Sequence, residues 1–424
     1  MSFDGFVNEH GPFRFGFKGG KDSEGKARQE LELWENPYSW SKAANMLFVD
    51  SPAGVGMSYS ETPRDYHTND TQTAKDMNAF LRRWFTKYSE FQGSDFYVAG
   101  ESFGGVYVPL VSQAVLDGND AGDEPKLGLK AYLIGNGVTD PVYDGNAVVP
   151  FALGKSLIST KLYEKAYRDC HAGNYWNASL GSDCDRTLNA VWAELSGLNI
   201  YGILESCYHG HNPYRQPAAG RSLQAVSDGE QLHDEQPPSL EALQAAVRGL
   251  RQWPLVGGAK PGRVPGLAEM GLGHTPPCLD SREMWSFCNS REVREAIHAK
   301  PIEDIGRFDE CTNGDRIHYN HNIPSMIPVH QDLLARGLDA LIYSGDHDMA
   351  VPHTGSEAWT SSLGLQVQQD WRPWHTYDRQ VAGYAVHYRG LTYATIKGAG
   401  HMVPEDKPLE ALTMFERFLR GRKL

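Results

Sequence analysis

Apolar positions along the first 150 residues follow two alternating patterns. Short aromatic and aliphatic runs, typical of buried strands, occupy residues 45–54, 94–100 and 130–140. Between the first two runs, residues 76–91 form an amphipathic helical pattern. Its apolar face consists of Met77, Phe80, Leu81, Trp84, Phe85 and Tyr88. This alternation predicts an α/β protein with a mostly parallel central sheet flanked by helices.

The same alternation returns after Cys311. Strand patterns at residues 339–345 and 390–396 each run into a polar turn, and residues 409–421 form an amphipathic helix. Between the two halves, residues 209–277 are rich in proline, glycine and charge, with one helical pattern at 239–251. We therefore expect a core in two parts, 1–154 and 321–424. An inserted cap region, 155–320, separates them and includes an exposed linker at about 209–277.

Composition narrows the classes of partner and compartment. The net charge of −13 argues against nucleic acid or an anionic membrane, and no apolar stretch approaches a membrane span. The cysteine and histidine spacings do not match a zinc site, so we expect no metal and no cofactor. Clustered cysteines with glycosylation sequons at Asn69 and Asn177 favour an oxidising secretory compartment. The first residues nevertheless lack the basic and apolar regions of a signal peptide.

Ser102 lies between two glycines, in Gly100-Glu101-Ser102-Phe103-Gly104. A strand pattern precedes it and a helical pattern follows, as around a nucleophilic serine on a sharp turn. We expect Gly100 and Gly104 to be required because a Cβ at either position would crowd the turn. The Phe103 N–H would then face the oxygen of a reacting carbonyl. An ordinary serine in a glycine-rich turn is the alternative.

A serine nucleophile needs a base and an acid that orients the base. Of the sixteen histidines, His401 follows a strand and a glycine turn, which would place it at the same edge of the sheet. Asp346 and Asp348 follow another strand and are the candidate acids. The order serine, aspartate, histidine is that of the α/β-hydrolases. The turns that carry Ser102, the candidate aspartates and His401 together favour a serine hydrolase.

Four motifs, at residues 49–60, 100–109, 341–359 and 396–408, resemble the serine carboxypeptidases when taken together. The resemblance extends over nearly the whole chain and is strongest to the plant-type carboxypeptidase I branch. It implies an α/β-hydrolase fold with an inserted cap. By the family pattern the nucleophile is Ser102, the base His401 and the acid Asp348, and Asp346 is a turn former.

The resemblance also gives a role to two glutamates, Glu9 and Glu101. Both match carboxyl groups with which the family holds the C-terminal carboxylate of its substrate. A carboxylate accepts another carboxylate only when a proton lies between them. Two neighbouring glutamates meet this need because their like charges raise one pKa, so that the pair retains a proton in mild acid.

The cysteines and the chain ends carry further expectations from the family. Cys170 with Cys184 and Cys207 with Cys278 match family disulfides, while Cys288 and Cys311 have no assigned partner. Relatives of this branch are cut in the linker into two disulfide-linked chains. They also carry a signal peptide and an Asn-Gly-Gly-Pro-Gly-Cys-Ser segment before the position of Met1. We therefore expect an N-terminally truncated chain from the secretory pathway, either vacuolar or lysosomal or extracellular.

The sequence thus predicts a serine-type carboxypeptidase that acts on peptide or protein C-termini and is most active at acidic pH. Two alternatives remain at this point. One is a related acyltransferase, which passes the acyl group to an alcohol. The other is a catalytically impaired secreted binding protein, because the second oxyanion-hole donor belongs to the absent segment. The oligomeric state is left open, a homodimer included.

Overall fold

The computed structural model describes residues 2–21, 27–207, 278, 282–310 and 316–424. The strands are β1 (Phe13–Lys21), β2 (Ala27–Glu35), β3 (His67–Asn69), β4 (Phe96–Glu101), β5 (Leu129–Gly135), β6 (His318–Asn320), β7 (Asp339–Gly345), β8 (Val367–His375), β9 (Val381–Tyr388) and β10 (Leu391–Ile396). The helices are α1 (Ser2–Asp4), α2 (Asp70–Lys87), α3 (Gly104–Ala121), α4 (Pro141–Gly154), α5 (Thr160–Asp169), α6 (Asp183–Glu194), α8 (Arg282–Cys288), α9 (Arg291–Ala296), α10 (Ile302–Ile305), α11 (Ile327–Ala335), α12 (His353–Ser362), α13 (Val403–Asp406) and α14 (Pro408–Leu419).

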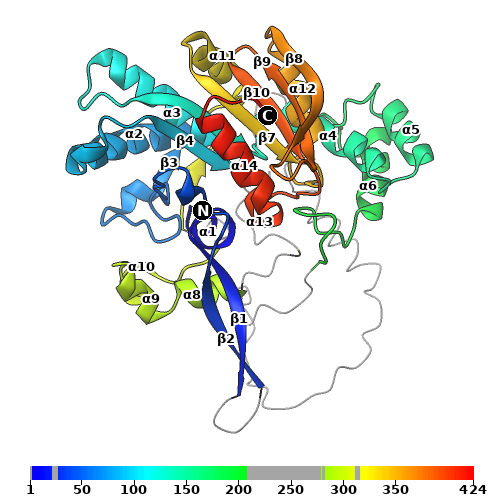
Figure 1. The fold of residues 1–424 in the computed structure, drawn as a ribbon. Coiled ribbons are helices and arrows are strands. Elements are labelled where there is room, and N and C mark those ends of the chain that lie inside the picture. Colours follow the sequence, from blue (N-terminus) through cyan, green and yellow to red (C-terminus); the bar gives the residue numbers. More distant parts are fainter. Residues whose placement is uncertain (1, 22–26, 208–277, 279–281, 311–315) are drawn as a thin grey trace.

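A central sheet has the strand order β4-β5-β7-β10-β9-β8 (Figure 1). Its first four strands are parallel, whereas β9 and β8 are antiparallel to their neighbours. The parallel strands β5 and β7 are almost wholly buried, because helices cover both faces. This confirms the predicted mostly parallel sheet. The apolar runs did not predict β8, whose residues are mostly exposed or half-buried.

Two apolar layers enclose the sheet. On one face, α2, α3, α11 and α12 pack against residues such as Tyr132 and Ile342. On the other face, α14 packs against residues such as Leu133 and Tyr343, and crosses the front of the sheet in Figure 1. Trp40 completes this second layer by stacking on Phe415, with ring centroids 4.1 Å apart.

The strand expected at residues 45–54 is not formed. This segment is irregular, and the side chain of Leu47 is 42% exposed. A strand is stabilised by hydrogen bonds to a neighbour, and β4, at the edge of the sheet, pairs with β5 alone among the described residues. The apolar pattern was therefore interpreted wrongly. The predicted helix at 76–91 is formed by α2 as far as Lys87, and Ser89–Phe91 make a separate short turn. Phe80 in α2 and Tyr88 just after it are exposed, although both were expected on the apolar face.

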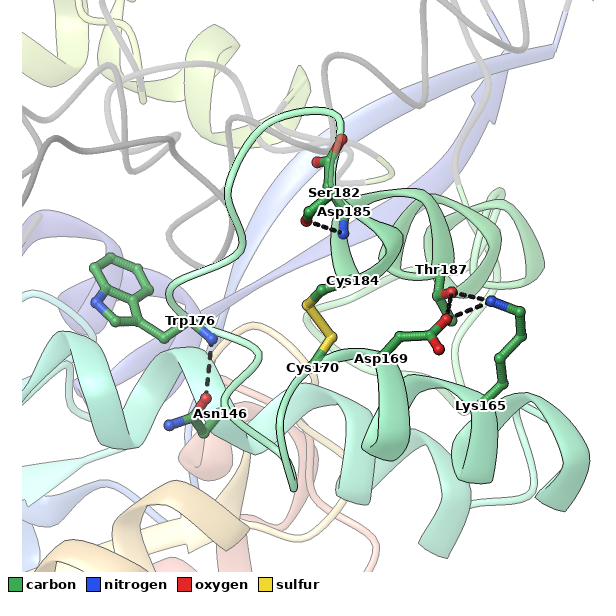
Figure 2. The surroundings of a disulfide bond; sticks show 9 residues. All are labelled: Asn146, Lys165, Asp169, Cys170, Trp176, Ser182, Cys184, Asp185 and Thr187. Carbon is green, nitrogen blue, oxygen red and sulfur yellow. Dashed lines mark hydrogen bonds and ion pairs between the residues drawn. A yellow bond between two sulfur atoms is a disulfide. The ribbon is translucent and has the colours of Figure 1, made fainter.

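The structure describes two separate helical parts of the inserted region. In the first, α5 and α6 pack on α4 and are joined by the disulfide Cys170–Cys184 (Figure 2). The N–H of Trp176 donates to Oδ1 of Asn146 in α4 at 2.9 Å, which ties this part to the core. In the second part, α8 packs against the N-terminal segment, away from α5 and α6 (Figure 1). The expected linker at 209–277 and the helix at 239–251 lie outside the described residues.

Candidate active site

Ser102 occupies a sharp turn between β4 and α3. Its φ is +59°, a left-handed conformation that is uncommon for a residue other than glycine. The turn is held by the N–H of Ser102, which donates to the Gly135 carbonyl at 3.0 Å. The Ser102 carbonyl accepts from the N–H groups of Gly105 at 2.9 Å and Val138 at 3.0 Å. Backbone strain of this kind persists only where surrounding contacts over-determine it.

Only one of the two glycines that flank this serine is as crowded as predicted. A Cβ on Gly100 would lie 2.8 Å from Cγ2 of Val108, so this position is crowded as expected. At Gly104 the nearest atom would be 4.0 Å away, and the expectation of crowding there is wrong. The restricted position is Gly105, where a Cβ would lie 2.2 Å from the Val138 carbonyl oxygen. The turn therefore packs against the loop after β5, a contact that local sequence does not reveal.

Phe103 lies at the N-terminus of α3, where backbone N–H groups have no partner within the helix. Among the described residues, the Phe103 N–H is not used in any hydrogen bond of the turn. It is thus available to an oxygen outside the chain, as the prediction requires. The Phe103 ring lies edge-on to His321, with centroids 5.0 Å apart.

Asp348 and His401 meet at the carboxyl ends of β7 and β10. Nδ1 of His401 and Oδ2 of Asp348 are 2.8 Å apart, and both side chains are almost wholly buried. The other oxygen of Asp348 accepts from the N–H groups of Ala350 at 2.8 Å and Val351 at 3.2 Å. This arrangement fixes the carboxylate so that it can orient the imidazole.

Sequence reasoning missed Asn136, which directly supports Asp348. Its Nδ2 donates to Oδ2 of Asp348 at 2.7 Å, and its Oδ1 accepts from the Gly345 N–H at 3.3 Å. The side chain is wholly buried, and φ is +45°. The available signal was a Gly-Asn-Gly turn directly after a buried strand, which resembles any other turn in the sequence.

The strand order brings Ser102 to the same edge of the sheet as Asp348 and His401, because β4, β7 and β10 are parallel. A bond between the Ser102 hydroxyl and His401 is not among the hydrogen bonds of the described residues. Such catalytic bonds are often long until substrate binds. The inserted region also reaches this site, since the His401 N–H donates to the Tyr201 carbonyl at 2.5 Å.

Asp346, the other aspartate of this loop, has different partners. Its Oδ1 accepts from the Gly398 N–H at 2.6 Å and lies 2.6 Å from Nδ1 of His347. Asp346 therefore links the loop after β7 to the loop after β10 without contacting His401. This fits its interpretation as a turn former.

Glu101 is the last residue of β4, and Glu9 lies at the end of a short helical turn, Gly5–Glu9. The backbone around Glu9 is held by buried Asn36, whose Nδ2 donates to the carbonyls of Glu9 at 3.1 Å and Gly11 at 3.0 Å. Arg14 also donates to the Glu9 carbonyl, at 3.3 Å, and to the carbonyl of Pro404, at 2.7 Å. The segment that carries Glu9 is thereby attached to the loop beyond His401.

The two carboxyl groups interact, and their surroundings favour the protonated form. Burial raises the pKa of Glu101 well above its usual value, and the charge of Glu9 raises it further. Burial and the charge of Asp4 raise the pKa of Glu9 to about 7. The charge of Asp348 also raises the pKa of Glu101, so the pair lies within electrostatic reach of the candidate acid. A pair of this kind shares a proton in mild acid.

Tyr343 is a further residue that sequence reasoning did not single out. In the sheet register, Glu101 is opposite Gly135, and Gly135 is opposite Tyr343. A Cβ on Gly135 would lie 2.5 Å from the Tyr343 hydroxyl, so the phenol ring lies across this glycine. Burial and the charges of Glu101 and Glu9 raise the pKa of Tyr343, which keeps the phenol neutral.

The structure pairs Cys170 with Cys184 and Cys207 with Cys278, the pairs that the family resemblance implies. Cys288 is buried and forms no disulfide, whereas Cys311 lies outside the described residues. Within the described ranges, no group of three or more histidine, cysteine or acidic side chains is arranged to hold a metal ion. No helix in the same part of the chain is long and apolar enough to cross a membrane.

Comparisons with known proteins agree with this geometry. The family model described as serine carboxypeptidase matches residues 1–421. Serine carboxypeptidase 1 of Hordeum vulgare is 46% identical over 100% of this chain and 81% of its own length. Serine carboxypeptidase-like 20 of Arabidopsis thaliana is 45% identical over 100% of this chain and 82% of its own.

Among solved structures, the chain is similar to Kex1Δp, a prohormone-processing carboxypeptidase from Saccharomyces cerevisiae. The TM-score is 0.65 at 20% identity, and the match covers 99% of this chain and 80% of that one. This likeness supports the predicted α/β-hydrolase fold. Together with the family match and the two plant relatives, the findings lead to one conclusion: the chain is a member of the serine carboxypeptidase family.

Proposed function

We propose that this protein is a serine-type carboxypeptidase that releases C-terminal residues from peptides and proteins through an acyl-enzyme. Ser102 is the nucleophile, His401 the general base and Asp348 the group that orients His401. The Phe103 N–H binds the oxyanion. Glu9 and Glu101 hold the free carboxylate of the substrate, which limits cleavage to the last peptide bond.

The reaction follows from these roles. His401 takes the proton of the Ser102 hydroxyl as its oxygen attacks the last peptide carbonyl, and Asp348 stabilises the imidazolium that forms. The Phe103 N–H, at the start of α3, donates a hydrogen bond to the carbonyl oxygen and stabilises the negative charge that develops there. His401 then gives its proton to the leaving amine. Water, activated by the same imidazole, hydrolyses the acyl-enzyme and restores Ser102.

The observation that best supports an exopeptidase is the buried glutamate pair beside the serine. Glu101 precedes Ser102 directly, and both glutamates have raised pKa values. A buried pair without a proton would repel an anion. With a proton it can donate to the carboxylate of a peptide, and the raised pKa keeps that proton bound in mild acid.

Two alternatives are less well supported. The relatives that are 46% and 45% identical carry the carboxypeptidase name, which favours hydrolysis over acyl transfer to an alcohol. A catalytically impaired binding protein would not need the hydrogen bond between His401 and Asp348 or the strained Ser102. Transfer of an acyl group from a peptide to an added alcohol, compared with release of the free acid, separates hydrolase from transferase.

We also propose a lumenal or extracellular location in the secretory pathway, the vacuole included. Two disulfides support it, because such bonds persist in oxidising compartments. Asn177 is exposed and so accessible to glycosylation, while Asn69 accepts a hydrogen bond from the Gln72 N–H at the start of α2. The division at residues 154 and 320, linker cleavage and a homodimer stay predictions.

Substitution of the nucleophile tests the proposal. We expect Ser102→Ala and His401→Ala each to lower kcat/KM for a peptide by on the order of 10⁴-fold or more. A fluorophosphonate probe should label the unaltered chain at Ser102 and fail to label Ser102→Ala. Substantial peptide turnover by Ser102→Ala, or labelling elsewhere with equal rate, would overturn the assignment.

A further inference from the structure

Asp70, the first residue of α2, is a wholly buried carboxylate that the mechanism above does not use. Its Oδ1 accepts from the Tyr319 hydroxyl at 2.9 Å and lies 3.5 Å from Nδ1 of His321. Its Oδ2 accepts from the N–H groups of Asn322 at 2.7 Å and Ile323 at 3.0 Å. Burial opposes a charge at Asp70, but its hydrogen bonds outweigh burial and hold its pKa below the usual value. One carboxylate therefore holds four consecutive groups of a distant segment.

This segment, residues 318–323, is also attached to α2 by its backbone and by Asn322. Strand β6 pairs in parallel with β3, which directly precedes α2. Nδ2 of Asn322 donates to Oγ1 of Thr71 at 2.7 Å, and the Thr71 N–H donates to Oδ1 of Asn322 at 3.3 Å. The side chains of the segment are thus carried on a backbone that is tied to the core.

Two aromatic rings of the same segment surround Phe103, the residue after the candidate nucleophile. The Phe103 ring is edge-on to His321, with centroids 5.0 Å apart, and to Tyr319, with centroids 6.1 Å apart. Tyr107, one turn further along α3, makes a third edge-on contact at 4.9 Å. Aromatic rings favour this arrangement at such separations. The Phe103 ring is therefore held by three rings, two of which are held by Asp70.

The position of the Phe103 ring bears on the peptide group between Ser102 and Phe103. At the carbonyl end, this group is held by the N–H groups of Gly105 and Val138, at 2.9 and 3.0 Å. At the other end is the Phe103 N–H, whose direction also depends on where Cα of Phe103 lies. A donor lowers the barrier most when it is aimed at the oxyanion before the reaction begins. The three rings fix that second end.

We propose that Asp70, acting through His321 and Tyr319, is a positioning residue that aims the Phe103 N–H at the oxyanion. The inference rests on the role of the Phe103 N–H in the proposed function. Asp70 itself does not touch the substrate. Without its carboxylate, the two rings lose the bonds that fix them, and Phe103 can shift on the strained turn at Ser102. Stabilisation of the oxyanion then weakens, whereas binding of the substrate carboxylate by the two glutamates does not.

A peptide aldehyde tests the proposal together with a peptide substrate. The Ser102 oxygen adds to the aldehyde carbon and the hydroxyl proton passes to His401, which leaves an oxyanion where the reaction forms one. The quantities measured are kcat, KM and the Ki of the aldehyde, for the unaltered chain, Asp70→Asn, His321→Ala and Tyr319→Phe. The amount of fluorophosphonate bound at completion counts the competent sites, so that kcat is expressed per folded site.

We expect Asp70→Asn and His321→Ala to lower kcat per site roughly ten- to a hundred-fold and to raise the Ki of the aldehyde by a similar factor. KM should change by less than about threefold. Tyr319→Phe keeps its ring and loses only the hydroxyl, so its kcat should fall by about two- to fivefold. Asp185→Asn, which replaces another buried aspartate in the first turn of a helix, is the control and should change none of the three quantities.

A purely structural role for Asp70 would reduce the number of competent sites and the melting temperature but leave kcat per site and Ki unchanged, and that result would overturn the proposal. A fall in kcat without a matching rise in Ki would overturn it as well. If Asp70→Asn does not fold, His321→Ala and Tyr319→Phe decide the question by the same criteria. An unaltered chain that neither binds the fluorophosphonate nor hydrolyses peptides would overturn the proposed function, and this inference with it.

Discussion

Asp348 and Glu101 are carboxyl groups at the same edge of the sheet, but their surroundings differ. Asp348 is wholly buried and accepts from Asn136, His401, Ala350 and Val351. Oε2 of Glu101 is also buried, yet it has no hydrogen-bond partner among the described residues. Four donors can stabilise a negative charge at Asp348, whereas burial and the nearby Glu9 oppose one at Glu101.

The comparison shows that depth of burial alone does not assign a role to a carboxyl group. A carboxylate with donors on both oxygens is a fixed anion, suited to orient an imidazole. A buried carboxyl group whose neighbour is a second carboxyl group retains a proton, suited to receive an anion. The first should therefore control the rate of the chemical step, and the second should control binding of the substrate carboxylate and its dependence on pH.

The largest effect is expected in kcat, from substitution of Asp348. Asp348→Asn should lower kcat by on the order of 10³–10⁴-fold, because the amide nitrogen cannot accept from Nδ1 of His401. KM for a peptide acid should keep its dependence on pH. Steady-state kinetics from pH 5 to pH 8 measure both quantities. Asp346→Asn, in the same loop, is the control and should retain most of the kcat of the unaltered chain. An equal loss of kcat in the two variants would contradict the assignment of Asp348, and not Asp346, as the group that orients His401.

A smaller effect is expected in KM, from substitution of Glu101. For the unaltered chain, KM for a peptide acid should rise above about pH 7, by up to about tenfold per pH unit, as the glutamate pair loses its proton. Glu101→Gln should flatten this rise, because its amide donates at any pH. KM for the matching peptide amide should vary little with pH in both proteins. Equal pH dependence for acid and amide in the unaltered chain would contradict the role of the pair.

The smallest effect is expected in stability. A carboxyl group whose pKa is raised by folding stabilises the fold below its unfolded pKa, and this contribution is lost as pH rises through the folded pKa. Glu101→Gln removes the buried charge, so its melting temperature should exceed that of the unaltered chain by roughly 2–4 °C at pH 8. At pH 4.5 the two should agree. Calorimetry measures the difference, and Glu61→Gln, at an exposed position outside the helices and strands, is the control expected to show none. A lower melting temperature for Glu101→Gln at pH 8 would argue against a buried charge.

Several parts of the site followed from local pattern. Parallel strands buried on both faces appear as apolar runs, and polar residues directly after such runs lie at one edge of the sheet. Ser102, His401 and the two candidate acids Asp346 and Asp348 were found in this way, and the family resemblance then selected Asp348. Glu9 had no such signal, because it lies in a short turn near the start of the chain, and only the family resemblance singled it out.

Other parts could not be read from local pattern. Residues 45–54 have the composition of a strand but lack a neighbouring strand among the described residues, and pairing is a property of two segments. Gly104 and Gly105 look equivalent in sequence, yet the Val138 carbonyl approaches only the second closely. Asn136 resembles an ordinary turn residue until the end of β7 is placed beside it.

Local pattern was thus enough for the parallel strands β4, β5, β7 and β10, for the order of serine, aspartate and histidine and for the sharp turn at Ser102, because each depends on neighbours in sequence. Whether a carboxyl group is a fixed anion or retains a proton depended on tertiary structure. Its donors and neighbouring charges come from other loops: Asn136 approaches Asp348 from the turn after β5, and Glu9 approaches Glu101 from the N-terminal segment. Hydrogen bonds and charges act over a few ångströms in space, so the distance between residues along the chain does not predict them.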